Sequence, residues 1–311
     1  MVDIDRQTAA RIAWYHFQEG LTQGAIAEKL GLTRARVNQA IGEMRSNGFI
    51  QVRIADPHGA CVALEAELKT VFSLKGAVVV PAPGDETDVR RVTGLAAGHY
   101  VSDRLQDGQV LGLGWGGTLD AAATALERRR GRGNTVVSLC GGFPRSTPVN
   151  PYDVAGRFAR ILDAECYYVT APMFADNPGM RAALVASKTV RQVFDQVKKI
   201  DFLLLSAVDL TRKSRSLEYG LITDKLRRSL LAAGAVGDIC GHYLDSEGRR
   251  IDHEINETLL VPELADLVAI PHIVLASGGA QKLPIIRAAI AANLCHTLIT
   301  DEGTGAALLQ R

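Results

Sequence analysis

A glycine-rich run in the middle of the chain, residues 111–120 (LGLGWGGTLD), has the residue types of an anion-binding turn. Gly112, Gly114 and Gly117 follow the G-x-G-x-x-G spacing, and Thr118 comes directly after them. Glycines let several backbone N–H groups approach one ligand, and the amino end of a helix favours negative charge. A threonine hydroxyl adds a further donor. The run therefore predicts a site for phosphate or a similar anion.

Three interpretations of this run are open: the pyrophosphate of a dinucleotide, the phosphate of a small ligand, and a structural turn without a ligand. A dinucleotide site also needs an acidic residue about 20 positions further on, at the end of the next strand. That strand is predicted at TVVSLC and ends in Cys140 and Gly141, without a carboxylate. Trp115 would also crowd a pyrophosphate. We therefore favour a single phosphate or sugar phosphate and expect no cofactor.

Residues 1–55 predict a second kind of chemistry, the recognition of DNA bases. In the segment 21–50, Thr22 and Thr33 are placed to cap two short helices, and Gly31 can adopt the positive φ of a tight turn between them. The second helix would bury its apolar positions and face outward with side chains that bind base edges and phosphates. The predicted DNA-contacting residues are Thr33, Arg34, Arg36, Asn38 and Gln39.

The local charge agrees with this helix-turn-helix interpretation. From Lys29 to Arg53 there are five basic residues and one acidic residue, Glu43, whereas the net charge of the whole chain is only +1. Nucleic acid must therefore be bound by a local patch. The following FIQVRI, residues 49–54, predicts a wing strand. The alternative is a helical hairpin that only mediates dimerisation, but the outward residue types and the charge favour DNA.

The remainder of the chain predicts an α/β domain. The segment 55–60 (ADPHGA) predicts a hinge, and residues 62–72 predict an amphipathic helix. Apolar runs such as AVVV, TVVSLC, FLLLSAV and IVLAS then alternate with helical patterns, which indicates a doubly wound parallel sheet covered on both faces. We predict a helix-turn-helix domain at 1–55, a linker helix at 56–75 and the α/β domain at 76–311. Ligands of such sheets bind beyond the carboxyl ends of the strands, where the glycine run is predicted.

Composition excludes several classes of protein. A chain of 311 residues with 47% hydrophobic residues can form two cores. The five cysteines are odd in number and widely spaced, which is typical of reduced core residues in a cytoplasmic protein. The seven histidines show no ligand spacing, so we expect no metal. No secretory signal or membrane-spanning apolar run is evident, and we expect no membrane association.

The order of the motifs resembles a known family. A helix-turn-helix, a linker helix, GLGWGGTL, AVGDICGHYLDSEGR and IVLASGGAQKLPIIRAAIAANLCHTLITDEGTGAALL together are similar to the SorC family of sugar-responsive bacterial transcriptional regulators. The resemblance covers nearly the whole chain. It implies an effector domain similar in fold to ribose-phosphate isomerase and glucosamine-phosphate deaminase. The effector-binding residues that it implies are Gly114, Gly116, Gly117, Thr118, Asp238, Asp245 and Lys282.

In this resemblance the glycines and Thr118 hold a phosphate, the two aspartates bind sugar hydroxyls, and Lys282 completes the charge pairing. The residues alone leave alternatives open, because Asp245 suits the start of a turn and Asp238 suits a cap. Lys282 in the first turn of a helix would oppose the helix dipole, which favours a functional role. The segment DLTRKSRSLEYG, which contains Arg212, departs from the family pattern and leaves open what binds the far end of the ligand.

We therefore predict a DNA-binding regulator, a repressor of a carbohydrate or polyol catabolic operon, controlled by a phosphorylated sugar or polyol. Its partners would be double-stranded operator DNA, the effector, and further copies of the chain in a homodimer or homotetramer, since a palindromic operator requires a two-fold. The alternative is a phosphosugar isomerase or deaminase with an accessory N-terminal domain. Isomerisation needs a base beside the carbonyl, and Asp209 and Glu218 have no companion pattern that marks catalysis. We therefore do not expect an enzyme.

Overall fold

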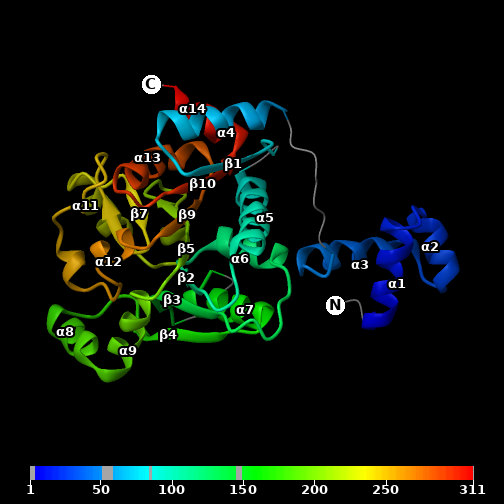
Figure 1. Ribbon diagram of the computed structural model, residues 1–311, viewed down its shortest axis with the longest axis horizontal. Coiled ribbons are helices and arrows are strands. Elements are labelled where there is room, and N and C mark those ends of the chain that lie inside the picture. The colour runs from blue at the N-terminus through cyan, green and yellow to red at the C-terminus, as the bar shows by residue number, and fades with distance from the viewer. Residues whose placement is uncertain (1–3, 51–58, 84–85, 145–148, 311) are drawn as a thin grey trace. The chain divides into compact units, whose positions relative to one another are not determined.

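The computed structural model describes residues 4–50, 59–83, 86–144 and 149–310 (Figure 1). The chain divides into two compact units, Met1–Ala55 and Asp56–Arg311. The hinge predicted at 55–60 and the wing strand predicted at 49–54 lie largely outside the described residues, because residues 51–58 are not among them.

The first unit is built from three helices around a small apolar core. The helices are α1 (Arg6–Phe17), α2 (Gln23–Leu30) and α3 (Arg34–Ser46). The core consists of Ile12, Ile26, Ala27, Val37, Ala40, Ile41 and Met44. Thr22 Oγ accepts the N–H of Ala25 at 3.3 Å, and Thr33 Oγ accepts the N–H of Arg36 at 3.2 Å. Gly31 has φ +64°, so both predicted caps and the predicted turn are confirmed.

The second unit contains a seven-stranded sheet in the order β1-β10-β9-β5-β2-β3-β4, and every pair in it is parallel. The strands are β1 (Gly76–Val80), β2 (Val110–Leu113), β3 (Thr135–Gly142), β4 (Glu165–Pro172), β5 (Phe202–Leu205), β9 (His272–Ala276) and β10 (Thr297–Asp301). Connections from β2 lead outward through β3 to β4, whereas those from β5 lead the other way through β9 to β10. The strand order therefore reverses between β2 and β5.

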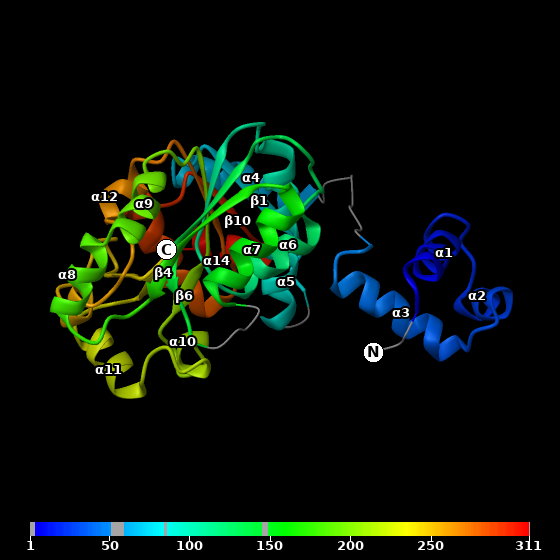
Figure 2. The same cartoon turned by 90° about the horizontal axis from the view of Figure 1, so that it is seen from below.

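Helices cover both faces of this sheet. On one face lie α5 (Glu86–Arg104), α6 (Gly117–Ala125) and α7 (Pro151–Leu162), which appear next to one another in Figure 2. On the other face lie α4 (Gly59–Val71), α9 (Lys188–Val197), α13 (Leu283–Ala291) and α14 (Glu302–Leu309). Phe202 and Leu204 of β5 belong to the core beneath α5, α6 and α7, whereas Leu203 and Leu205 belong to the core on the other face. Both faces of the strand are buried, which is why its sequence is continuously apolar.

A small antiparallel sheet follows β5 after one residue. Its order is β6-β7-β8, formed by β6 (Ala207–Asp209), β7 (Gly237–Ile239) and β8 (His242–Leu244). The remaining short helices are α8 (Pro178–Ala186), α10 (Arg215–Glu218), α11 (Asp224–Ala232), α12 (Leu264–Val268), and the 3-10 turns Glu254–Glu257 and Ala280–Lys282, of which α10 and the turn Ala280–Lys282 pack against β6. Because β6 continues from β5, this part of the chain lies at the carboxyl end of the large sheet.

The helix that we predicted as a linker is an integral part of the second unit. α4 packs against β1 and α14, and its Leu68 is fully buried. The Glu65 carboxylate of α4 accepts the N–H of Val79 in β1 at 2.9 Å. α4 is therefore fixed to the sheet, and a conformational change in the α/β unit can move it directly.

Candidate ligand site and DNA-contacting helix

A cavity of about 450 Å³ opens at the carboxyl ends of β2 and β5. This is the point where the strand order reverses, which is the usual ligand position in open α/β sheets. Its volume suits a small ligand. The described residues that line it come from 115–118, 206–209, the segment 211–218, and Gln281 and Lys282, with Arg90 and Val149.

The glycine run forms one wall of the cavity. β2 ends at Leu113, and the Gly114 N–H donates to Leu204 O at 3.0 Å. Gly116 then adopts φ +115° and ψ 170°, which a residue with a side chain rarely adopts, and caps α6 without a side-chain hydrogen bond. The first N–H groups of α6 have no partner within the helix. The N–H groups of Gly117 and Thr118 are therefore placed to receive an anion.

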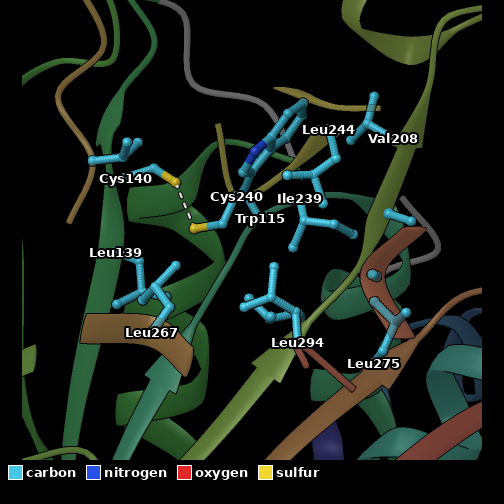
Figure 3. Packing of buried hydrophobic residues seen from close by; sticks show 14 of the residues in the cluster. Trp115, Leu139, Cys140, Val208, Ile239, Cys240, Leu244, Leu267, Leu275 and Leu294 are labelled. Carbon is cyan, nitrogen blue, oxygen red and sulfur yellow. Dashed lines mark hydrogen bonds between the residues drawn. The ribbon is translucent and has the colours of Figure 1, made fainter. Parts of the chain in front are cut away.

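Trp115 anchors this turn to the core. Its side chain is buried among Val208, Ile239 and Leu244, as Figure 3 shows, and Ser206 Oγ donates to its backbone oxygen at 2.7 Å. Beside it, Cys140 Sγ and Cys240 Sγ lie 3.2 Å apart as free thiols. The contact with Cys240 and burial hold the pKa of Cys140 well above that of an ordinary thiol. Both cysteines are buried core residues, as predicted.

Lys282, at the end of the turn Ala280–Lys282, also lines the cavity. The residue is only 9% exposed, and no carboxylate in the described part of the chain pairs with its ammonium within 4.0 Å. Burial lowers the pKa of Lys282 to about 8; Asp209 opposes this shift, while Arg90 and Arg215 add to it. A buried cation without a direct partner is costly, and an anionic ligand would compensate it.

The remaining polar groups of the cavity make it positive. Arg90, Arg212, Lys213, Arg215 and Lys282 line it together with two carboxylates, Asp209 and Glu218. The Asp209 carboxylate accepts the N–H of Thr211 at 2.9 Å and its hydroxyl at 2.6 Å, and Glu218 pairs with Arg215. Both carboxylates are therefore engaged within their own loop, so the surplus of cations favours a negatively charged ligand.

In the first unit, α3 has the form of a recognition helix. Val37, Ala40, Ile41 and Met44 are buried, whereas Arg34, Arg36, Asn38 and Gln39 are exposed, as predicted. At 100° per residue, Ala35, Asn38, Gln39 and Gly42 occupy the face opposite the core, and Arg34 and Arg36 lie on its two flanks. The small residues allow close approach to a groove floor, and the arginines can reach its walls.

The polar groups on and around α3 are also partly engaged with one another. Gln23 Nε2 donates to Asn38 Oδ1 at 3.2 Å, and Gln39 Nε2 donates to Glu43 at 3.0 Å. Lys29 pairs with Glu19 at 3.7 Å and lies over the Tyr15 ring. Lys29 is therefore engaged with Glu19 and Tyr15 at the end of α2.

Comparisons with known proteins identify both units. Residues 56–310 match the family "Putative sugar-binding domain", and residues 18–51 match the family "Winged helix-turn-helix DNA-binding". The chain is 32% identical over 314 residues to the transcriptional regulator LsrR of Klebsiella pneumoniae, covering 98% of this chain and 93% of the relative. It is 29% identical over 313 residues to the erythritol catabolism regulatory protein EryD of Brucella abortus, covering 99% and 98%. The chain belongs to the SorC family.

Solved structures agree with this fold. The full-length sorbitol operon regulator SorC from Klebsiella pneumoniae has a TM-score of 0.75 at 24% identity, covering 98% of this chain and 99% of that one. This SorC-family protein is thus a transcriptional regulator with a helix-turn-helix DNA-binding unit and a sugar-binding domain, not an enzyme. No helix in the described ranges is both long and apolar enough to cross a membrane.

The structure brings together four of the residues that the SorC resemblance implied. Gly116, Gly117, Thr118 and Lys282 line one cavity, although Lys282 is remote in sequence from the other three. Gly114 does not line it, because it belongs to the end of β2 and lies against Leu205. The glycine contribution to the cavity therefore begins at the cap of α6.

The two predicted sugar-binding aspartates lie elsewhere. Asp238 of β7 lines a separate void of about 10 Å³ beneath Trp115, next to Tyr243, and is not among the cavity residues. Burial raises the pKa of Asp238 to about 7, although its carboxylate accepts the Gly241 N–H. Asp245 accepts the N–H groups of Glu247 and Arg249, each at 2.9 Å, and forms a turn outside the cavity. For Asp245 the alternative role of a turn residue holds.

Asp209 and Arg215 line the cavity and belong to DLTRKSRSLEYG, the segment for which the sequence left open what binds the far end of the ligand. Their place beyond the end of the predicted strand FLLLSAV was a usable signal for assigning them. Arg90 on α5 carries no local signal, because only the packing of α5 beside α6 brings it to the site. No group of three or more metal-ligand side chains gathers in the described part of the chain.

Proposed function

We propose that this regulator binds a phosphorylated sugar or polyol in the cavity and that occupancy changes its affinity for operator DNA. One observation carries the proposal: the free amino end of α6, Thr118 and the buried Lys282 converge on one cavity at the switch point of the sheet. Backbone N–H groups and an ammonium suit a phosphate, and Ser206, Asp209 and Gln281 offer polar groups for hydroxyls.

The names of the relatives support a polyol or a pentose as the class of effector. One is named for erythritol catabolism, and another, 26% identical over 307 residues, is the deoxyribonucleoside regulator of Bacillus subtilis. A phosphorylated polyol or pentose fits a cavity of about 450 Å³. We propose repression of a carbohydrate or polyol catabolic operon, by a homodimer or homotetramer on a palindromic operator. In this proposal Thr33, Arg34, Arg36, Asn38 and Gln39 contact the DNA.

A thermal-shift panel tests the phosphate claim. The panel contains aldose, ketose and polyol phosphates, each with its unphosphorylated parent, together with inorganic phosphate, NAD and NADP. At 100 times its Kd, a ligand specific for the folded state adds about 2.7 kcal/mol of stability. We expect at least one phosphorylated compound to raise the melting temperature by about 5 °C or more, its parent to do much less, and the dinucleotides to do nothing.

The control is Lys213→Met, which removes a cation at an exposed lining position. It should keep most of the shift, because Lys213 is solvated and its charge is screened. Equal stabilisation by a sugar and its phosphate would remove the phosphate from the proposal. Micromolar binding of NAD would restore the dinucleotide interpretation.

A further inference from the structure

The loop that carries Lys282 is fastened to the amino end of α14. The Gly279 N–H donates to Asp301 Oδ2 at 3.2 Å and to Thr304 Oγ at 2.7 Å. Thr304 in turn donates its N–H to Asp301 Oδ1 at 3.0 Å and its hydroxyl to Asp301 Oδ2 at 2.5 Å. Asp301 is 4% exposed and Thr304 is 2% exposed. This cluster of Gly279, Asp301 and Thr304, here termed the α14 hub, is thus shielded from water.

The fit between the loop and the α14 hub is tight. A Cβ on Gly278 would lie 2.4 Å from Asp301 Oδ2, and Gly279 has φ +101°. The Lys282 N–H donates to Gly279 O at 2.9 Å, so Gly279 and Lys282 are the two ends of one turn. A displacement of the Lys282 backbone therefore moves the group that the α14 hub holds, or breaks its hydrogen bonds.

A neighbouring side of α14 contacts α4. The two helices pack against each other and lie side by side in Figure 1. A side chain at Gly305, one residue after Thr304, would contact Leu68 of α4, which is fully buried. α4 begins at Gly59 and is the first described element of the α/β unit after the DNA-binding unit. The α14 hub thus connects the cavity loop to the helix that follows the recognition module.

We propose that Asp301 and Thr304 couple effector binding to operator binding. An anion attracted to Lys282 displaces the turn from Gly279 to Lys282. The hydrogen bonds of the α14 hub then move the start of α14, and α14 changes the position of α4 against the sheet. A ligand alters an equilibrium only through unequal affinity for its two states, and the α14 hub supplies the contact that differs. This inference rests on the proposed function, because it needs an anion at Lys282.

A plain helix cap is the competing explanation, because Asp301 also caps α14. A cap stabilises the fold whether or not an effector is bound, whereas a coupling residue changes the ratio of the operator Kd with and without the effector. That ratio is a readout that a merely structural role leaves unchanged. Operator affinity measured both with and without the effector is the evidence that an allosteric mechanism requires.

The test uses the full chain with Thr304→Val, which removes the hydroxyl and keeps the β-branched shape. Thr304→Ser is the conservative variant. Thr223→Val is the matched control, because Thr223 caps α11 through the Leu226 N–H at 3.1 Å without touching the cavity loop. Operator Kd is measured by fluorescence anisotropy with and without the phosphorylated compound that gives the largest thermal shift. The Kd of this phosphorylated compound for the protein is measured calorimetrically with and without operator.

In the wild type, effector and operator should change each other's Kd by the same factor, between about 5-fold and 150-fold. Thr304→Val should reduce this factor below about 3-fold and leave each separate Kd within about 3-fold of the wild type. Thr304→Ser and Thr223→Val should retain the wild-type factor. Wild-type coupling in Thr304→Val overturns the inference and leaves the proposed function standing. A wild type without any coupling overturns the proposed function, and the inference with it.

Discussion

Lys282→Met is expected to stabilise the unliganded protein and to abolish its response to the effector. Burial lowers the pKa of Lys282 from 10.5 to about 8, and one pKa unit corresponds to about 1.36 kcal/mol. The charged lysine therefore costs the fold up to about 3 kcal/mol. Met has a similar length and no charge, so it should recover much of this. Denaturant unfolding at pH 7 measures the gain.

The pH dependence of this gain has a definite sign. Since the pKa of Lys282 is lower in the folded state, the unfolded chain binds more protons between about pH 8 and pH 10.5. The penalty is complete below pH 8 and fades as the pH rises to 10.5. The advantage of Lys282→Met should therefore be largest near neutral pH and shrink at pH 10. A variant less stable than the wild type at pH 7 would show that Lys282 is not an unpaired cation.

The Lys282 ammonium is also expected to determine the affinity for the ligand. Because the anion needs the protonated lysine, effector affinity should weaken as the pH rises above about 8. In Lys282→Met, calorimetry should show binding weakened by about 10-fold to 150-fold, because a charge-assisted contact is worth about 1.5–3 kcal/mol and its loss leaves part of the anion's charge uncompensated. Lys213→Met provides the comparison with an exposed cation. Unchanged affinity in Lys282→Met would place the phosphate elsewhere.

Asn38→Ala is expected to reduce affinity for the specific operator by about 10-fold to 100-fold and affinity for random DNA much less. A good bidentate base contact is worth about 1–3 kcal/mol, and Asn38 lies on the face of α3 opposite the core. The operator can be selected from random duplexes with the wild-type chain. Anisotropy titrations with selected and scrambled duplexes then give the two affinities.

Charge provides the control for this experiment. Arg11→Ala removes an exposed cation from α1, away from the predicted recognition face, and should change both affinities little. Arg36→Ala removes a cation from a flank of α3 and should also lower the salt dependence, if its guanidinium contacts a phosphate. Equal losses on specific and scrambled DNA for Asn38→Ala would show that the residue does not read bases.

The DNA-binding unit could be predicted from sequence because its determinants are local. Thr22, Gly31 and Thr33 each fix a helix end through bonds to residues within four positions, and the apolar spacing then determines which side of α3 is buried. The parallel sheet was predictable for a similar reason. A strand buried on both faces, such as β5, needs a continuous apolar run, and that run is visible without tertiary information.

The ligand site was predictable only in part. Gly116 and Thr118 could be found because an anion site at a helix amino end is a property of one short segment. Lys282 was found through family resemblance, since its place depends on the pairing of β5 with β9. Arg90 could not be found, because only the packing of α5 beside α6 brings it there. For Asp245 the sequence left two roles open, because a carboxylate that closes a turn looks the same in sequence as one that binds a hydroxyl.

In the proposed regulation, operator affinity depends on a phosphorylated ligand in the cavity, and one titration tests this dependence most directly. Wild-type protein is titrated into fluorescent operator duplex at constant ionic strength, with no addition, with the phosphorylated compound selected by thermal shift, and with its unphosphorylated parent. We predict that the phosphorylated compound weakens operator binding by about 5-fold to 150-fold and that the parent does not. Identical operator affinity in all three titrations, at compound concentrations that raise the melting temperature, would contradict the proposed regulation.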